Sequence, residues 1–263
     1  MQRAGAWSGW PPVATLVEHA THVHPKHCDT LAMSDEAAEI PDETTPASEY
    51  PGDTLAAALA RHGVTLEPDQ VELLDRYARL LWDFNARLNL TRHTDYERFV
   101  ARDLRDVMAL ADLLEVGEHV LDLGTGGGVP GIPLAIIRPD INVSLCESIA
   151  KKARAVGEIV AALGIDVPVY HQRAEQVVEE QNVDTIVARA VGPLEKILGW
   201  LGPHWDRFNR LLLVKGPNWT DERQAARHRG LLRGLELRRK VSYPLAGTES
   251  EGVVLEVRRE ESG

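Results

Sequence analysis

The stretch VLDLGTGGGVPG, residues 120–131, decides the fold of this chain. Apolar residues lead into an acid, and four glycines follow within five positions. A short buried strand that runs into glycines is typical of the first strand of a doubly wound α/β sheet, where the turn after the strand lies beneath the ligand crevice. Glycine at this turn lets the backbone approach a ligand and adopt dihedral angles that other residues avoid.

Downstream of this turn, apolar strand-like segments alternate with helical ones. Strands are predicted within 118–123, 141–148, 167–175, 183–191, 209–216, 237–245 and 252–260, and helices within 130–139, 151–164, 194–205 and 222–234. The alternation indicates an open, mostly parallel sheet of seven strands with helices on both faces. The last two strands are expected to form an antiparallel edge. We assign residues 116–260 to this α/β domain.

Upstream of the sheet, residues 53–115 are predicted to form a helical leader that packs on the domain. Apolar residues recur near helical spacing from Val71 to Leu88, and again from about Tyr96 to Leu114. Residues 1–50 are rich in Pro, Ala, Thr and acids without a sustained period, so this extension is predicted to be disordered. Its HVHPKHC stretch, residues 22–28, is interpreted as a histidine-containing tail, because no second ligand pair closes a zinc site. No metal is expected.

Composition excludes several classes of protein. The chain has 263 residues, 44% of them hydrophobic and 26% charged, which is ordinary for a globular protein. No apolar stretch approaches the roughly 18 residues that a membrane span needs, and the two cysteines cannot make a disulfide framework. We expect a cytoplasmic monomer that makes no membrane contact. The net charge of −11 argues against coating nucleic acid by bulk charge, although residues 207–240 hold ten Lys or Arg against three acids.

Two kinds of ligand fit the glycine turn. Residues 126–131 formally satisfy the G-x-G-x-x-G pattern of dinucleotide-binding proteins, which is a weak signal alone. S-adenosylmethionine has no phosphate, and Asp122 beside the first glycine can receive its ammonium group, whereas a carboxylate there would repel a pyrophosphate. Pro130 and Pro133 are an unusual helix entry for a dinucleotide fold, and Glu147 is placed to accept both ribose hydroxyls in either case. For Asp122, a helix or loop cap remains the alternative.

At this point the chain resembles a known family. The residues that carry the resemblance are NLT (89–91), DLGTGGGVPGIPLAIIRPD (122–140), Glu147, Ser148, Lys151, Lys152, RAE (173–175), ARA (188–190), Lys215 and Gly216. Together they resemble the ribosomal RNA small subunit methyltransferase G family, also called glucose-inhibited division protein B, over about residues 70–258. The resemblance implies a Rossmann-like class I methyltransferase fold. It also implies methyl transfer from S-adenosylmethionine to guanine N7 in small-subunit (16S) ribosomal RNA, with the RNA or the 30S subunit as partner.

The resemblance also implies which residues form the site. Gly124 and Val129 match loop positions at the cofactor, and Glu147 matches the acid that binds the ribose; Gly126 of the same loop is taken as a further cofactor contact. Ala174 and Glu175 match the pair beside the adenine ring, and Arg189 matches an arginine that faces both cofactor and substrate base. We take Arg189 as the catalytic candidate and Asp122 as a further cofactor contact. The alternative for Arg189 is a structural ion pair with Glu175 or Asp184.

Two positions depart from the family pattern. The family usually has a histidine, followed by Leu-Asp-Ser, where this chain has Asp103-Leu104-Arg105-Asp106-Val107, and an Arg-His pair where it has Glu251-Gly252. Phosphate contacts are expected from basic residues after the second strand and in the C-terminal third, namely Lys151, Lys152, Arg154, Arg207, Arg210, Arg223, Arg227, Arg229, Arg233, Arg238, Arg239 and Lys240. Trp82, Trp200, Trp205 and Trp219 are predicted to be mainly packing residues, with a place near the target base as the alternative for Trp219.

Other functions remain open from the residues alone. A methyltransferase that acts on a small molecule would need the same cofactor site. A dinucleotide-binding oxidoreductase would use the same glycine turn. An RNA-binding or assembly protein could keep the fold without catalysis.

Overall fold

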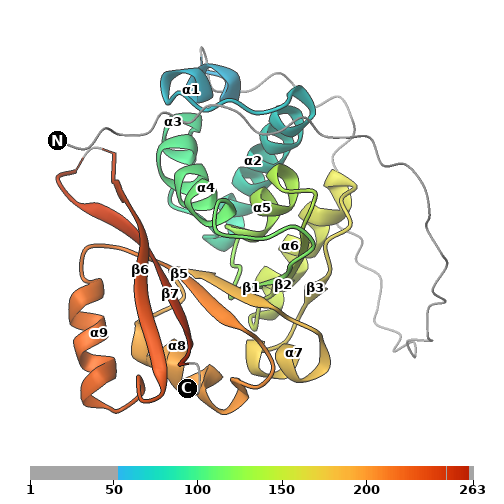
Figure 1. The fold of residues 1–263 in the computed structure, drawn as a ribbon. Coiled ribbons are helices and arrows are strands. Elements are labelled where there is room, and N and C mark those ends of the chain that lie inside the picture. Colours follow the sequence, from blue (N-terminus) through green and yellow to red (C-terminus); the bar gives the residue numbers. More distant parts are fainter. Residues whose placement is uncertain (1–52, 247, 261–263) are drawn as a thin grey trace, which may run out of the picture. The chain divides into compact units, whose positions relative to one another are not determined.

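A seven-stranded sheet in the order β3-β2-β1-β4-β5-β7-β6 forms the centre of the protein (Figure 1). The computed structural model describes residues 53–246 and 248–260. The strands are β1 (His119–Leu123), β2 (Asn142–Cys146), β3 (Val169–Tyr170), β4 (Thr185–Arg189), β5 (Arg210–Lys215), β6 (Leu235–Pro244) and β7 (Glu251–Arg259). Strands β1 to β5 pair in parallel, and β7 pairs antiparallel with both β5 and β6. The predicted seven-stranded, mostly parallel sheet with an antiparallel edge is therefore confirmed.

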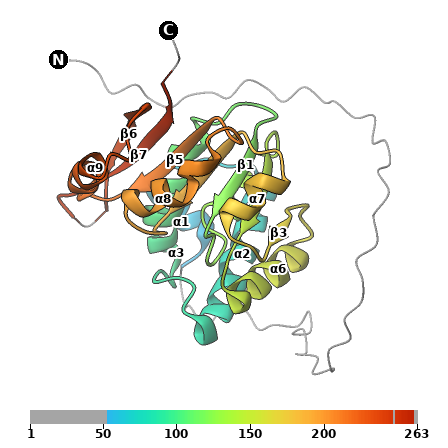
Figure 2. The ribbon, with the colours of Figure 1, turned by 90° about the horizontal axis from the view of Figure 1, so that it is seen from below.

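Helices cover both faces of this sheet (Figures 1 and 2). They are α1 (Leu55–Arg61), α2 (Pro68–Leu88), α3 (Tyr96–Arg98), the π-helical η1 (Phe99–Leu104), α4 (Arg105–Ala111), α5 (Gly131–Ile137), α6 (Ala150–Leu163), α7 (Ala174–Glu180), α8 (Leu194–Leu201), the 3₁₀ turn η2 (Gly202–His204) and α9 (Trp219–His228). Neighbouring residues of β1 point to opposite faces: Val120 packs with the leader helices, α5 and α6, whereas Leu121 packs with α7, α8 and α9. Two apolar layers result, one on each side of the sheet.

Local signals in the sequence account for the leader. Pro68 occupies the first position of α2, where its missing N–H is not needed, and Asn89 ends the helix in the left-handed region at φ 50°. The second predicted helix, expected to run to Leu114, ends at Ala111 and contains a π-helical segment. This wider turn changes which side chains of the segment point toward the sheet.

The register of the parallel strands brings three strand ends together. Leu123 at the end of β1 lies beside Cys146 at the end of β2, and Asp122 lies beside Val187 of β4, two residues before Arg189. The carboxyl ends of these strands therefore share one edge of the sheet, where open α/β sheets bind their ligands.

One helix was not anticipated from the sequence. The segment 167–175 was predicted as strand and loop, but β3 is only two residues long and Ala174 already begins α7. The helix is one amphipathic stretch that buries Val177 and Val178, and at its start the Gln176 side chain accepts the Arg173 amide at 3.2 Å. Seven residues are too few for a helical period to stand out in the sequence.

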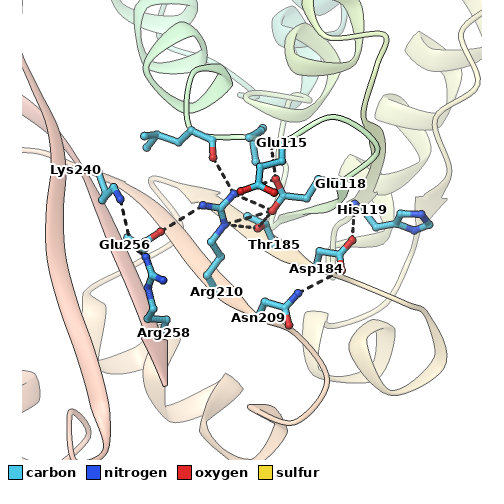
Figure 3. A network of polar contacts seen from close by, with 12 residues as sticks. Glu115, Glu118, His119, Asp184, Thr185, Asn209, Arg210, Lys240, Glu256 and Arg258 are labelled. Atoms are coloured by element: carbon cyan, nitrogen blue, oxygen red, sulfur yellow. Dashed lines mark hydrogen bonds and ion pairs between the residues drawn. The ribbon is translucent and has the colours of Figure 1, made fainter. Parts of the chain in front are cut away.

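A polar network around Arg210 lies at the end of the sheet where β1, β4 and β5 begin, opposite the glycine turn (Figure 3). The guanidinium donates to both carboxylate oxygens of Glu118 at 2.9 and 3.0 Å, to the Leu113 carbonyl at 2.8 Å, and to the Thr185 hydroxyl at 2.8 Å. It also lies 3.3 Å from a carboxylate oxygen of buried Glu256. Arg210 thus links the end of the leader to β1, β4 and β7. The expectation that Arg210 contacts RNA phosphate is wrong, because its donors are committed to this network.

We expect Arg210→Met to lower the free energy of unfolding by about 3 kcal/mol, since it leaves the largely buried carboxylate of Glu118 without its cation. The control is Arg207→Met, whose ion pair with Asp206 is exposed at 3.6 Å, so its loss is expected to change stability by less than about 1 kcal/mol. Urea denaturation of both variants measures the difference. Equal effects would contradict a structural role for the network.

Candidate active site

The glycine turn after β1 is folded by its own backbone. The Thr125 amide donates to the Cys146 carbonyl at 3.1 Å, and the Gly128 amide donates to the Thr125 carbonyl at 2.9 Å. Gly126 has φ 58°, and a β-carbon there would meet no atom closer than 3.9 Å, so open space lies in front of it. At Gly131 a β-carbon would lie 2.1 Å from the Leu145 side chain, so only glycine fits. Gly126 is therefore open toward a ligand, and Gly131 lets α5 pack closely on the sheet.

Asp122 holds this turn from below. Its side chain is fully buried, and one carboxylate oxygen accepts the Thr125 hydroxyl at 2.5 Å and the Gly131 amide at 2.9 Å. Burial raises the pKa of Asp122 to about 6, although both hydrogen bonds act in the opposite direction. Oδ2 of Asp122 thus caps the turn, whereas Oδ1 is buried without a hydrogen-bond partner in the described residues, and the contact of Asp122 with the ammonium group stays a prediction.

Glu147 lies one residue beyond the end of β2. Its two carboxylate oxygens accept the Gly126 amide at 3.1 Å and the Ile149 amide at 2.8 Å. These bonds leave each oxygen with a further lone pair. The carboxylate is thus oriented beside the open glycine, where a ligand with hydroxyl groups would meet it.

Arg189 ends β4 and pairs with two acids of the leader. Its guanidinium contacts the Asp103 carboxylate, and its Nε lies 3.1 Å from Asp106. Within the described residues the buried Nη1 atom has no hydrogen-bond partner. The prediction named Glu175 or Asp184 as structural partners, and the observed partners are different. They could not be read from the sequence, because Asp103 and Arg189 are 86 positions apart.

Two more side chains extend this ion cluster. The Tyr243 hydroxyl of β6 donates to Asp106 at 2.5 Å, and Nδ1 of His93 lies 2.9 Å from Asp103. Burial raises the pKa of Asp106, while the positive charge of Arg189 acts in the opposite direction. The cluster joins the loop after α2, the π-helical segment, α4, β4 and β6 in one polar network.

A cavity of about 1190 Å³ opens at this edge of the sheet. Every predicted site residue except Asp122 lines it, namely Gly124, Gly126, Val129, Glu147, Ala174, Glu175 and Arg189. The leader adds residues that sequence reasoning did not assign to the site, namely Arg92, His93, Arg102, Asp103 and Asp106. A signal in the sequence existed only for Asp103 and Asp106, namely the departure from the family pattern at 103–107. The volume exceeds that of most small-molecule pockets, so a cofactor and a substrate base have room together.

The aromatic residues differ in part from their predicted places. Trp82 and Trp205 are buried, as predicted. Trp200 is 38% exposed and lines the cavity, so its prediction as a packing residue is wrong. Trp219 packs against the apolar layer that contains α7, α8 and α9, as predicted, and does not line the cavity.

The remaining predictions concern the N-terminal extension, metal binding and membrane contact. The predicted extension 1–50 and its histidine stretch lie outside the described residues. Among residues 53–246 and 248–260, no group of three or more His, Cys, Asp or Glu side chains could hold a metal ion. No helix of that described part is long and apolar enough to cross a membrane.

The strand order, the glycine turn and the cavity beside it define a Rossmann-like methyltransferase of class I that uses S-adenosylmethionine. The family model described as "rRNA small subunit methyltransferase G" matches residues 70–244. The chain belongs to this family, which confirms the resemblance read from the sequence. Membership in a methyltransferase family also rejects the oxidoreductase alternative.

Individual relatives agree with this assignment. A Ribosomal RNA small subunit methyltransferase G from Rhodopirellula baltica is 48% identical over 78% of this chain and 96% of its own length. The protein of that name from Pseudomonas aeruginosa is 34% identical over 66% of this chain and 82% of its own length. Among solved structures, the crystal structure of a mutant of MtNAS aligns with a TM-score of 0.50 and 17% identity, covering 73% of this chain and 74% of that one. That likeness concerns the fold alone.

We expect Asp122→Asn to be more stable than the wild type at pH 7.5, by at most about 3 kcal/mol. The folded carboxyl has a pKa of about 6, above its ordinary value of 3.8, so ionisation of the buried acid opposes folding. As the pH falls from 7 to 4, the wild-type carboxyl becomes protonated at a higher pH in the folded state than in the unfolded state. The difference in the free energy of unfolding between variant and wild type should therefore shrink. Thermal or urea unfolding across this pH range measures it.

The matched control is Glu256→Gln, because the pKa of buried Glu256 is lowered by its basic neighbours despite the opposing effect of burial. Its ionised form stabilises the fold, so this variant should lose stability at pH 7.5 and lose less as the pH falls. A pH-independent effect of Asp122→Asn would contradict the assignment of a strained buried carboxylate.

Proposed function

We propose that this methyltransferase transfers a methyl group from S-adenosylmethionine to guanine N7 in 16S ribosomal RNA. The observation that carries the proposal is the cavity itself. In a member of this family, it joins an open glycine turn and Glu147 on one side to Arg189 and the leader on the other. The first side suits a nucleoside cofactor, and the second suits a polar substrate.

The cofactor side fits the adenosyl group. Glu147 would accept the ribose hydroxyls, because its oxygens are oriented by two backbone amides and keep free lone pairs. Gly126 leaves open space for the ligand beside that carboxylate. Ala174 and Glu175 begin α7 at the cavity wall, so a backbone amide and a carboxylate are available to the adenine edge. Asp122 acts beneath, by keeping the turn in shape.

Glu147→Gln is expected to weaken the binding of S-adenosylhomocysteine about tenfold, since a neutral amide is a weaker acceptor for two hydroxyls than a carboxylate. Calorimetry without RNA measures the affinity. The matched control is Glu158→Gln on α6, which removes an exposed carboxylate whose ion pair with Arg154 is 3.6 Å long. If both variants bind like the wild type, Glu147 does not hold the ribose.

The chemistry asks little acid–base work of the protein. Guanine N7 carries a free lone pair at neutral pH, so no general base has to remove a proton first. Bound S-adenosylmethionine supplies an electrophilic methyl carbon on a positively charged sulfur, and the electron pair of the broken bond stays on the sulfur. The residues of the cavity have to align the two reactants and exclude water, and alignment alone contributes about 7–11 kcal/mol in favourable cases.

Arg189 is the proposed substrate contact. Its Nη1 is a buried donor without a partner in the described chain, and leaving such a donor unpaired costs about 1–3 kcal/mol. Guanine O6 or a phosphate oxygen would satisfy it. The purine becomes positively charged on methylation at N7, so a guanidinium over the ring would be unfavourable. Asp103 and Asp106 hold Arg189 in the wall and place negative charge near the base.

The rim of the cavity supports an RNA substrate. Arg92, Lys152 and Arg173 line the cavity, and none of the three forms an ion pair within residues 53–246 and 248–260. Several predicted phosphate contacts of the C-terminal third are instead paired with acids: Arg229 with Glu195, Arg238 with Glu236, and Lys240 with Glu256. We therefore favour an RNA path across the rim of the cavity. We further propose that the protein acts as a cytoplasmic monomer.

Tritiated S-adenosylmethionine tests the function directly. The protein is incubated with 30S subunits, with naked 16S ribosomal RNA, and with a mixture of small methyl acceptors. We expect label in RNA and, after nuclease digestion, in 7-methylguanosine. Label only in a small acceptor would favour the small-molecule alternative, and label in no arm, despite binding of the cofactor, would favour an RNA-binding protein without catalysis.

Arg189→Lys is expected to reduce the rate of methyl transfer by about tenfold or more, because lysine keeps the charge but loses the fork that spans two acids and the substrate. Binding of S-adenosylhomocysteine should be kept. The control is Arg210→Lys, the same change at a guanidinium remote from the cavity, which is expected to lower stability while sparing the rate per folded molecule. A normal rate in Arg189→Lys would exclude the substrate role.

A further inference from the structure

His93 and Asp103 form a pair in the substrate side of the cavity. The imidazole Nδ1 lies 2.9 Å from Oδ1 of Asp103, and Arg189 contacts the same oxygen. Asp103 is 1% exposed, whereas the His93 side chain is 22% exposed, and all three residues line the cavity. One carboxylate oxygen is thus shared between an imidazole and the proposed substrate contact.

The backbone of His93 is held without help from its own ring. Its amide donates to the Thr91 hydroxyl at 3.0 Å, and its carbonyl accepts the indole N–H of Trp82 at 2.8 Å. The Thr91 amide in turn donates to the side chain of Asn85 at 2.8 Å. Because the loop is fixed by these three bonds, the contact of the imidazole with Asp103 is not needed to build the loop.

The same contact has a clear effect on Asp103. A buried carboxylate oxygen that accepts hydrogen bonds from both an imidazole and a guanidinium is held in one rotamer, so the imidazole helps to keep Oδ1 of Asp103 directed at Arg189. When Nδ1–H donates to Asp103, the ring tautomer is defined and Nε2 has no proton in the neutral imidazole. Where the family usually has a histidine, this chain has the buried acid Asp103, and an imidazole from the preceding loop contacts that acid.

We propose that His93 and Asp103 act together as a positioning pair that orients Arg189 toward the substrate base. The proposal rests on the proposed function, since it assigns a role within the same reaction. His93 acts through Asp103, and Asp103 acts through Arg189, so neither has to touch the reacting atoms. The pair fixes the direction of the guanidinium, while Asp106 holds its Nε.

Two substitutions of His93 separate positioning from simple packing. Asparagine can place an amide N–H close to the place of Nδ1–H, so His93→Asn keeps the donor to Asp103, whereas His93→Leu keeps the bulk and removes the donor. We expect kcat to fall about tenfold to a hundredfold in His93→Leu, the range seen when an orienting partner is lost. The KM for S-adenosylmethionine should stay within about twofold. His93→Asn should recover most of the rate.

The matched control is His204→Leu. His204 also faces a carboxylate through Nδ1, at 3.3 Å from Glu179, with a similarly covered side chain, but it does not line the cavity. Its loss should leave kcat unchanged. A second readout does not depend on activity: the guanidinium Nε–H signal of Arg189 in ¹H–¹⁵N spectra, assigned by its loss in Arg189→Lys. The signal should be sharp in the wild type and in His93→Asn, and broadened in His93→Leu.

A wild-type rate in His93→Leu with an unchanged Arg189 signal would overturn the positioning role. So would His93→Asn being as slow as His93→Leu, since the restored donor would then have had no effect. Failure of the proposed function is seen elsewhere, as a wild-type protein that labels no ribosomal RNA. In that case the signal of Arg189 still reports whether His93 orients the guanidinium.

Discussion

The contact of Arg189 with Asp103 and Asp106 is the interaction on which the cavity depends. It joins the carboxyl end of a central strand to a helical segment that lies far away in the chain. Without it, the leader would still cover the sheet through its apolar residues, but the wall of the cavity would have no defined polar surface. An ion pair that is largely removed from solvent contributes little net stability relative to apolar packing. Its value in this protein is geometric, because it specifies where one guanidinium points.

The two sides of the cavity are built by different means. On the cofactor side, local backbone hydrogen bonds shape the glycine turn. Asp122 accepts the Gly131 amide, and Glu147 accepts the amides of Gly126 and Ile149. On the substrate side, the loop after α2, the π-helical segment, α4, β4 and β6 contribute side chains that meet only in the folded protein. A common cofactor needs a constant shape, which local structure supplies. A particular substrate needs a surface that can change, which side chains from several elements supply.

This difference explains what could be predicted from the sequence. Asp122, the glycine turn and Glu147 belong to one strand–turn–helix–strand unit, so their spacing alone indicated a nucleoside site and the first strands of the sheet. Most of the seven strands were recognised because they are short apolar runs bounded by turn residues, whereas β6 carries three consecutive basic residues. Asp103 and its contact with Arg189 could not be found in this way, because periodicity describes neighbours along the chain. In the sequence, residues 103–107 were recognised only as a departure from the family pattern. The fold shows in addition that the His93 side chain contacts Asp103.

Charge was the least reliable guide, and the reason is physical. A count of lysines and arginines treats each as free to bind phosphate, but a cation that is committed to an acid brings little net charge to a partner. Arg210 lies near the start of the basic stretch 207–240, and it is the hub of a structural network. Arg92 and Arg173, which belong to no basic run of the sequence, stand at the rim of the cavity without an ion-pair partner in the described residues. Attraction of an RNA backbone depends on such unpaired charges, because only they displace counterions when phosphate binds. The net charge of −11 is therefore compatible with an RNA substrate, because these unpaired cations stand at the rim of the cavity.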